Sequence, residues 1–261
     1  MKAFKKDFCF ALVCVGVYIL VLWNLIPFVY GIIDDRSMME IVSGQYLGMP
    51  DPHTIFMGYW YSLFLTGLYT VLPNVDWYAF CYIVMQAMCM ILILLRLVRE
   101  RERKWEKVLC AVLALSSFAA FGVQATVQLS FTTTAAVLGV TVVFLYATAE
   151  KLEWKDAALL FFLLFLTSQV RFDIFCMTVP VCAVLWIFRV AVQGQRERIQ
   201  FLMPAAALAV LALAMLGNFA GYGSAEWRAY KSYDNSRTAI YDFPDYTFPE
   251  YEGAEELYSS V

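Results

Sequence analysis

Eight long apolar runs dominate this sequence and restrict the folds open to it. They are residues 8–33, 55–72, 77–98, 108–124, 129–149, 157–170, 174–192 and 201–220. A helix of about 20 apolar residues is long enough to cross the hydrocarbon core of a bilayer. Hydrophobic residues make up 62% of the chain and charged residues 16%, against roughly 45–50% and about 25% in soluble domains. The pattern predicts an all-α fold, that of a polytopic helical membrane protein in a lipid bilayer.

The two ends of the sequence give separate expectations. The first run follows Lys2, Lys5 and Lys6. It is too long for the apolar part of a signal peptide and lacks a small-residue cleavage site, so we expect a retained signal-anchor helix. The sequence stops at Val261 without a closing span or a polar tail, so we expect that the native product continues or that the chain is a fragment.

The distribution of charge predicts how many runs cross the membrane. If all eight crossed, the basic cluster at 99–104 would face the side opposite the lysine-rich N-terminus, against the positive-inside rule. If residues 55–72 instead form an interfacial or re-entrant segment, seven spans remain and fourteen basic residues share the N-terminal side. These are Lys2, Lys5, Lys6, Arg96, Arg99, Arg101, Arg103, Lys104, Lys107, Lys151, Lys155, Arg189, Arg196 and Arg198.

The seven-span arrangement predicts a cytoplasmic N-terminus and an extracytoplasmic C-terminus. Residues 1–220 would form the transmembrane domain, with a first outer loop at 34–76, and residues 221–261 an extracytoplasmic segment. Gly58 and Gly67 interrupt the aromatic-rich stretch 55–72, and Pro73 follows it, as expected for a segment in the headgroup zone or one that lines a cavity. The cytoplasmic connections are short and basic, so we expect any chemistry at the outer face.

Asp34 and Asp35 lie where the first apolar run reaches that outer face. One interpretation is structural: an aspartate caps a helix, Arg36 and Glu40 form an i,i+4 pair, and Gly44 ends the helix. That interpretation explains one aspartate and does not require two. The other is functional, because adjacent carboxylates can serve as a catalytic base or as ligands for a divalent cation such as Mg²⁺ or Mn²⁺.

Three further polar side chains on the outer side are candidates, each with a structural alternative. His53, the single histidine, is either a hydrogen-bonding loop residue or part of the site, and it cannot form a zinc site without carboxylates. Arg171 either pairs locally with Asp173 or binds a lipid phosphate. Gln128 belongs to a polar patch at 124–134 that either caps and joins helices or lines a sugar site. The seven cysteines lie in or beside apolar runs and suggest small core residues.

Several segments resemble the GT-C class of integral membrane glycosyltransferases, and in particular GT-C-like proteins of Gram-positive anaerobic bacteria. An N-in first span ends in an acidic pair, and a long outer loop, serial spans and an arginine in a later outer turn follow. The matching segments are Asp34-Asp35-Arg36-Ser37-Met38-Met39, Ser43-Gly44, Gly48-Met49-Pro50-Asp51, Pro73-Asn74-Val75-Asp76-Trp77-Tyr78 and Tyr233-Asp234-Asn235-Ser236-Arg237-Thr238.

The resemblance implies a bacterial cell-membrane enzyme that transfers a sugar from a polyprenyl-phosphate donor to an extracytoplasmic glycan or envelope polymer. Asp34 or Asp35 would act as base or metal ligand, and Arg171 would bind the donor phosphate. Arg36, His53 and Gln128 are further candidates for substrate binding. We expect no nucleic-acid partner. The alternatives are a polysaccharide polymerase or ligase, a transporter of lipid-linked oligosaccharide, and an inactive truncated relative. Transport is disfavoured because we find no charge at mid-span.

Overall fold

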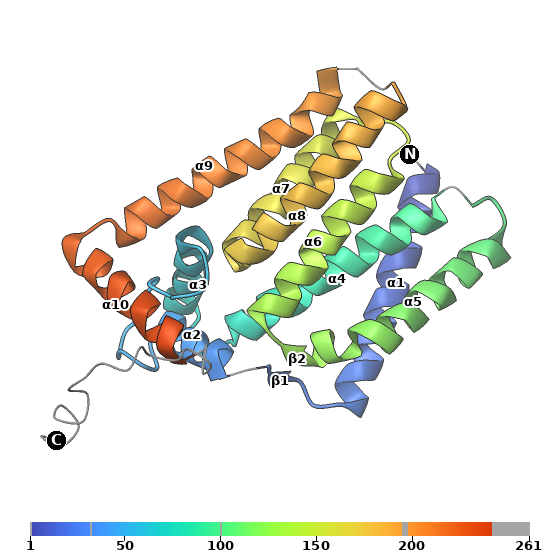
Figure 1. Ribbon diagram of the computed structural model, residues 1–261. Helices are drawn as coiled ribbons and strands as arrows, with labels where there is room; N and C mark the ends of the chain where they lie inside the picture. The colour runs from blue at the N-terminus through green and yellow to red at the C-terminus, as the bar shows by residue number, and fades with distance from the viewer. Residues whose placement is uncertain (1, 32, 100, 195–197, 242–261) are drawn as a thin grey trace, which may run out of the picture. The chain divides into compact units, whose positions relative to one another are not determined.

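The computed structural model describes residues 2–31, 33–99, 101–194 and 198–241, and almost all of them are helical (Figure 1). The chain divides into two compact units, Met1–Gly221 and Tyr222–Val261. The elements in chain order are α1 (Lys2–Leu25), β1 (Val29–Tyr30), α2 (Ile33–Ser43), α3 (Tyr59–Val71), α4 (Trp77–Val98), α5 (Lys104–Val127), β2 (Gln128–Leu129), α6 (Phe131–Thr148), α7 (Trp154–Val170), α8 (Phe172–Ile187), a π-helical turn (Phe188–Val192), a 3-10 turn (Arg198–Phe201), α9 (Leu202–Tyr222) and α10 (Ala225–Tyr241).

Five helical segments of the described residues are long and apolar enough to cross a membrane. They are Phe4–Leu25, Trp77–Val98, Phe131–Thr148, Phe172–Val192 and Arg198–Tyr222. Helices α5 and α7 are not among the five, so the total of seven spans stays a prediction. Helix α3 has 13 residues and a length of about 20 Å, too short for a hydrocarbon core of about 30 Å.

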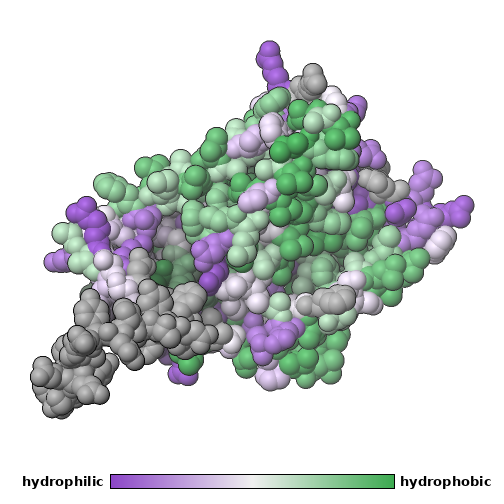
Figure 2. Space-filling model, viewed as in Figure 1, coloured by the Kyte–Doolittle hydropathy of each residue, from purple (hydrophilic) through white to green (hydrophobic). Residues whose placement is uncertain are grey.

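The surface of these helices suits a lipid environment. Large apolar side chains such as Leu20, Val140, Met177 and Leu208 are exposed along them. Figure 2 shows apolar side chains over much of one face of the helical bundle. Contiguous apolar surface of this kind is rare on soluble monomers and typical of surfaces that meet lipid or a partner. The structure therefore has the helices and the surface that a multi-pass membrane protein requires.

The first helix is shorter than its apolar run predicted. The run 8–33 was expected to form one helix, but α1 ends at Leu25. Pro27 has no N–H to donate and disfavours the helical conformation of Ile26 before it. The chain then extends into β1. The outer part of the run is therefore a short strand that leads to the two aspartates.

Helix α6 lies at the centre of the bundle, where it packs against α4, α7 and α8 (Figure 1). Its buried positions include the small residues Ala135 and Gly139. A Cβ atom added to Gly139 would lie 2.5 Å from the Thr178 hydroxyl of α8, so this close approach requires glycine. Small residues at helix interfaces allow the backbones to pack tightly.

Buried polar side chains also join the helices. The Gln86 amide of α4 donates to the Ala125 carbonyl of α5 and to the Thr134 hydroxyl of α6 at 3.0 Å each. Thr134 lies in the polar patch that the sequence placed near an outer turn. Its role as a link between helices agrees with the structural interpretation of that patch.

Basic residues collect at one end of the bundle, which we call the basic end: α1 and α7 begin there, and α4 and α6 end there. Arg189, only 5% exposed, donates to the Tyr146 carbonyl at 2.8 Å. Arg96 donates to the Thr148 carbonyl. Both cations thus neutralise the last carbonyl groups of α6 and its dipole. The opposite end, where α1 ends and α4 and α6 begin, carries the two aspartates and is called the acid-pair end.

Candidate functional site

Two very short strands hold the start of α2 against the start of α6. Strand β1 pairs in parallel with β2, with Val29 opposite Gln128 and Tyr30 opposite Leu129. The N–H of Gly31 continues the pairing by donating to the Leu129 carbonyl at 2.9 Å. These bonds bring together segments that lie about a hundred residues apart in the sequence. They place the aspartates beside the first turn of α6.

The two adjacent aspartates occupy opposite environments. Asp34 is exposed, whereas Asp35 is fully buried, with 0% of its surface exposed. The Oδ1 atom of Asp35 accepts hydrogen bonds from the Tyr78 hydroxyl at 3.0 Å and from the backbone N–H of Phe131 at 2.8 Å. The sequence predicted an aspartate that caps its own helix, but this carboxylate bonds the first N–H of α6. A carboxylate at a helix N-terminus is stabilised by the free N–H groups and the helix dipole.

The amphipathic pattern of α2 explains this difference. Asp35, Met38 and Val42 are its buried residues, and their spacing of three and four places them on one face. Asp34 and Arg36 lie off that face and are exposed. Arg36 pairs with Glu40 at 2.9 Å, as the i,i+4 spacing predicted. Gly44 ends the helix with φ +82°, also as predicted, because glycine adopts this left-handed conformation without steric cost.

Arg171 reaches the same turn of α6 from the α7–α8 connection. One of its terminal nitrogens donates to the Thr132 hydroxyl at 2.9 Å, and its guanidinium lies 4.8 Å from the centre of the Phe131 ring. Its predicted partner Asp173 is 3.5 Å away. Phe131 therefore meets Asp35 through its N–H and Arg171 through its ring. Phe56 of the outer loop stacks on that ring at 5.6 Å between ring centres.

A tyrosine–carboxylate cluster, made of Tyr30, Asp35, Tyr69, Asp76 and Tyr78, underlies this site and was not predicted. Asp76 caps α4 by accepting from the Ala79 N–H at 3.1 Å. It also accepts from the Tyr69 hydroxyl at 3.2 Å and from the Tyr30 hydroxyl. The Tyr69 hydroxyl in turn accepts from the Tyr78 N–H at 3.1 Å. An aspartate directly before an apolar run was the one sequence signal that pointed to the cap.

Burial and the neighbouring carboxylate keep the phenols of this cluster neutral. Burial, followed by the hydrogen bond to Asp76, raises the pKa of Tyr30 well above its ordinary value. Burial also raises the pKa of Tyr69, although its bond from the Tyr78 N–H opposes this. A protonated phenol can donate to a carboxylate, and a phenolate cannot. The cluster therefore links the starts of α2 and α4 and the end of α3 by hydrogen bonds.

The remaining predicted site residues make their contacts elsewhere. The Nδ1 atom of His53 lies 2.7 Å from Asp51 Oδ1, and its Nε2 atom lies 3.1 Å from the Gly221 carbonyl oxygen at the end of α9. Gln128 is exposed, and its side-chain oxygen accepts from Gln124 at 3.1 Å. Asp35 and Arg171 are thus brought together at Phe131. His53 joins the outer loop to α9, and Arg36 and Gln128 bond within their own segments.

The acid pair offers few ligands for a divalent cation. Within the described part of the chain, no cluster of three or more His, Cys, Asp or Glu side chains could hold a metal ion. Asp34 offers an exposed carboxylate, but Asp35 is buried and already accepts two hydrogen bonds through one of its oxygens. These residues do not by themselves fit a metal site. Binding of Mg²⁺ or Mn²⁺ by the acid pair stays a prediction.

No protein-family model, curated protein or solved structure matches this chain. The class of protein therefore rests on its own features: a nearly all-helical fold with five segments long and apolar enough to cross a membrane. The candidate groups for chemical function in this fold are those that meet at the start of α6.

Proposed function

We propose that the chain is a GT-C-like membrane glycosyltransferase. It would transfer a sugar from a polyprenyl-phosphate donor to a hydroxyl of an extracytoplasmic glycan or envelope polymer. The observation that supports this most is the gathering of an acidic pair and an arginine at one helix start. Asp35 and Arg171 both contact Phe131, and exposed Asp34 precedes Asp35 directly. A base and a phosphate-binding cation are the two groups that such a transfer needs.

In this proposal the two aspartates have different roles. Asp34 is the general base, because its exposed carboxylate can reach an acceptor hydroxyl. Asp35 is a positioning residue, because its bonds to Tyr78 and Phe131 fix the first turn of α2 against α4 and α6. A buried, hydrogen-bonded neighbour limits the movement of the backbone that carries the base. The sequence suggested both residues for catalysis, and the burial of Asp35 supports this division.

Arg171 supplies the positive charge for the leaving group. Thr132 and the Phe131 ring hold its guanidinium, and 27% of its side chain stays exposed. Asp173 competes only weakly with a phosphate for Arg171, because the Asp173 side chain is 69% exposed and lies 3.5 Å from the guanidinium. A guanidinium binds phosphate oxygens through two parallel hydrogen bonds. It would therefore stabilise the lipid phosphate as negative charge builds on it.

The proposed reaction is a single displacement with inversion. The acceptor oxygen attacks the anomeric carbon and forms the new glycosidic bond, while the bond from that carbon to the phosphate oxygen breaks. Asp34 takes the hydroxyl proton, and the lipid phosphate leaves with the bonding electrons beside Arg171. The site would face outward in a bacterial cell membrane, with the basic end in the cytoplasm and α5 and α7 as the sixth and seventh spans.

Sugar transfer by the purified protein in liposomes tests this proposal. The substrates are a panel of polyprenyl-phosphate sugars with envelope-polymer fragments as acceptors. Removal of a general base typically lowers the rate by about 10²–10⁴-fold, so Asp34→Asn should lose transfer while it stays folded. The matched control is Glu226→Gln, which changes an exposed carboxylate in the first turn of α10. Full transfer by the Asp34→Asn variant would end the assignment.

A further inference from the structure

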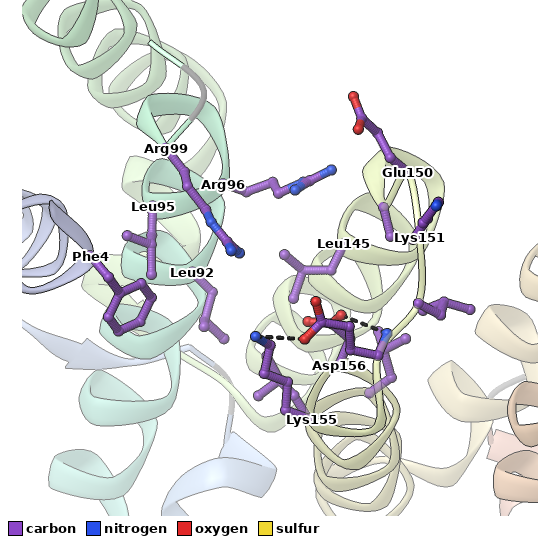
Figure 3. A pocket seen from close by; sticks show the side chains of 15 residues that line it. Phe4, Leu92, Leu95, Arg96, Arg99, Leu145, Glu150, Lys151, Lys155 and Asp156 are labelled. Carbon is purple, nitrogen blue, oxygen red and sulfur yellow. Dashed lines mark hydrogen bonds and ion pairs between the residues drawn. The ribbon is translucent and has the colours of Figure 1, made fainter. Parts of the chain in front are cut away.

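A cavity of about 740 Å³ lies at the basic end of the bundle (Figure 3). It is bounded by the start of α1, the ends of α4 and α6, and the start of α7. Neither Asp34 nor Asp35 lines it. The transferase proposal therefore does not explain this cavity.

Along α4, the residues that line the cavity change from apolar to cationic toward the end of the helix. Leu92 and Leu95 come first, and Arg96 and Arg99 follow. Arg99 follows Leu92 by seven positions, which corresponds to about 10 Å along the helix axis. The predicted span of this helix ends at Val98. The leucines therefore lie at acyl-chain depth and Arg99 at headgroup depth, if α4 crosses the bilayer.

The other two walls repeat this order. On α7, Lys155 lies in the first turn, and Leu159 and Leu160 lie one turn deeper. On α6, Leu145 precedes the turn that carries Lys151. All three walls thus place charged groups at the mouth and leucines inside. A ligand that fills this cavity must itself have a polar end and an apolar end.

Two of the three carboxylates that line the mouth, Glu153 and Asp156, have partners within the protein. Glu153 pairs with Lys155 at 2.7 Å, which lowers the pKa of Glu153. Asp156 accepts from the Glu153 N–H at 2.9 Å as part of a capping box. These two acids stabilise the start of α7, and Lys155 is neutralised by its pair. The remaining cations at the mouth therefore favour a ligand with negative charge.

Two cations at the mouth are available for an anion. The side chains of Arg99 and Lys151 are exposed and make no hydrogen bond or ion pair with any residue that the structure describes, and the charge of Arg99 adds to that of Lys155 in lowering the pKa of Glu153. Figure 3 shows Arg99 directed into the cavity from α4, with Lys151 across from it on the α6–α7 connection. Arg96, between them, is held by the Thr148 hydroxyl at 3.2 Å. The carboxylate of Glu150 lies above Arg96 in this view (Figure 3).

We propose that this cavity is a binding site for an anionic phospholipid. Arg99 and Lys151 bind the phosphodiester, and an acyl chain lies against Leu92, Leu145 and Leu159. Basic pockets between the cytoplasmic ends of membrane helices suit anionic headgroups, with about 1 kcal/mol for each cation near the surface. The leucines favour a lipid over free phosphate, because a soluble anion would leave them without a partner. This site does not depend on the transferase proposal.

Native mass spectrometry of the full chain, extracted in a neutral detergent, tests the site. The protein is titrated with phosphatidylglycerol and, separately, with phosphatidylcholine of the same acyl chains. We expect retention of one phosphatidylglycerol at concentrations where phosphatidylcholine is lost. The double variant Arg99→Gln/Lys151→Gln should weaken phosphatidylglycerol binding roughly 30-fold, because it removes two cations that each contribute about 1 kcal/mol. The variant Leu159→Trp, which fills the apolar interior, should weaken it without a change of charge.

The control variant is Arg101→Gln/Lys104→Gln, which removes two exposed cations at the same end that do not line the cavity. It should bind phosphatidylglycerol as the unmodified chain does. Equal loss in both double variants would mean general surface attraction and would overturn the site. Equal retention of the two lipids would overturn it as well. Displacement by deacylated glycerophosphoglycerol at concentrations similar to the lipid would show a site for soluble phosphate instead.

Discussion

The opposite exposure of Asp34 and Asp35 gives the sharpest test of the structure. In Asp35→Ala, the Tyr78 hydroxyl and the Phe131 N–H both lose a buried acceptor. A buried donor left without an acceptor costs about 1–3 kcal/mol, so two of them correspond to about 2–6 kcal/mol of unfolding free energy. Asp34→Ala removes the same side chain one residue earlier, but from an exposed position. It should leave the stability unchanged within experimental error.

Chemical denaturation in detergent micelles, followed by tryptophan fluorescence, measures both variants under one set of conditions. A third variant, Asp35→Asn, separates hydrogen bonding from charge. Its amide oxygen can still accept from Tyr78 and Phe131, so the unfolding free energy of this variant should lie between those of Asp35→Ala and the unmodified chain. Tyr78→Phe alone removes one donor, and combined with Asp35→Asn it should cost less than the sum of the two single changes.

Equal loss of stability in Asp34→Ala and Asp35→Ala would refute this reasoning. It would mean that the two carboxylates share an environment, and the division into a base and a positioning residue would fail with it. An Asp35→Ala protein as stable as the unmodified chain would contradict the anchoring of α2 to α6.

Two further predictions concern pH and packing. Because burial and Asp76 raise the pKa of Tyr30 above the 10.0 of a free tyrosine, the folded chain keeps a proton that the unfolded chain loses above that pH. The free energy of unfolding therefore falls as pH rises past about 10. Tyr30→Phe should make this fall shallower by about 1.4 kcal/mol per pH unit. An unchanged dependence of the unfolding free energy on pH, from denaturation curves between pH 9 and 11, would contradict this prediction. In the core, Gly139→Val must displace Thr178, 2.5 Å from the new Cβ, and should lower stability by about 1–3 kcal/mol. Gly122→Val, with open space around it, is the control, and an equal loss in both would contradict close packing there.

Local features of the fold could be read from the sequence because they depend on neighbouring residues. The apolar run 77–98 became α4 with the same bounds, and Gly44 ended α2 because no side chain opposes its positive φ. The Arg36–Glu40 pair formed from spacing alone. Each of these depends on residues within one or two helical turns, which periodicity and capping rules describe.

The site depends on contacts that those rules do not describe. Asp35 bonds Phe131 across 96 residues of sequence, through a pairing of two strands of two residues each. Strands this short leave almost no alternating pattern to detect. The two tyrosine hydroxyls that donate to Asp76 come from two different elements, β1 and α3, and nothing in their local spacing predicts that they converge. Exposure, which separates Asp34 from Asp35, became visible only with the fold.

Transfer from an outward-facing lipid-linked sugar requires that the acid-pair end face the outside of the cell. Single cysteines introduced at Gln45, in the outer loop, and at Glu102, at the basic end, are both at exposed positions. Labelling in intact cells with a membrane-impermeant maleimide, measured as the increase over the unmodified chain, reports the side directly. We predict labelling of Gln45→Cys in intact cells and of Glu102→Cys only after the cells are opened. The reverse result would place Asp34 in the cytoplasm and contradict transfer from an outward-facing lipid-linked sugar.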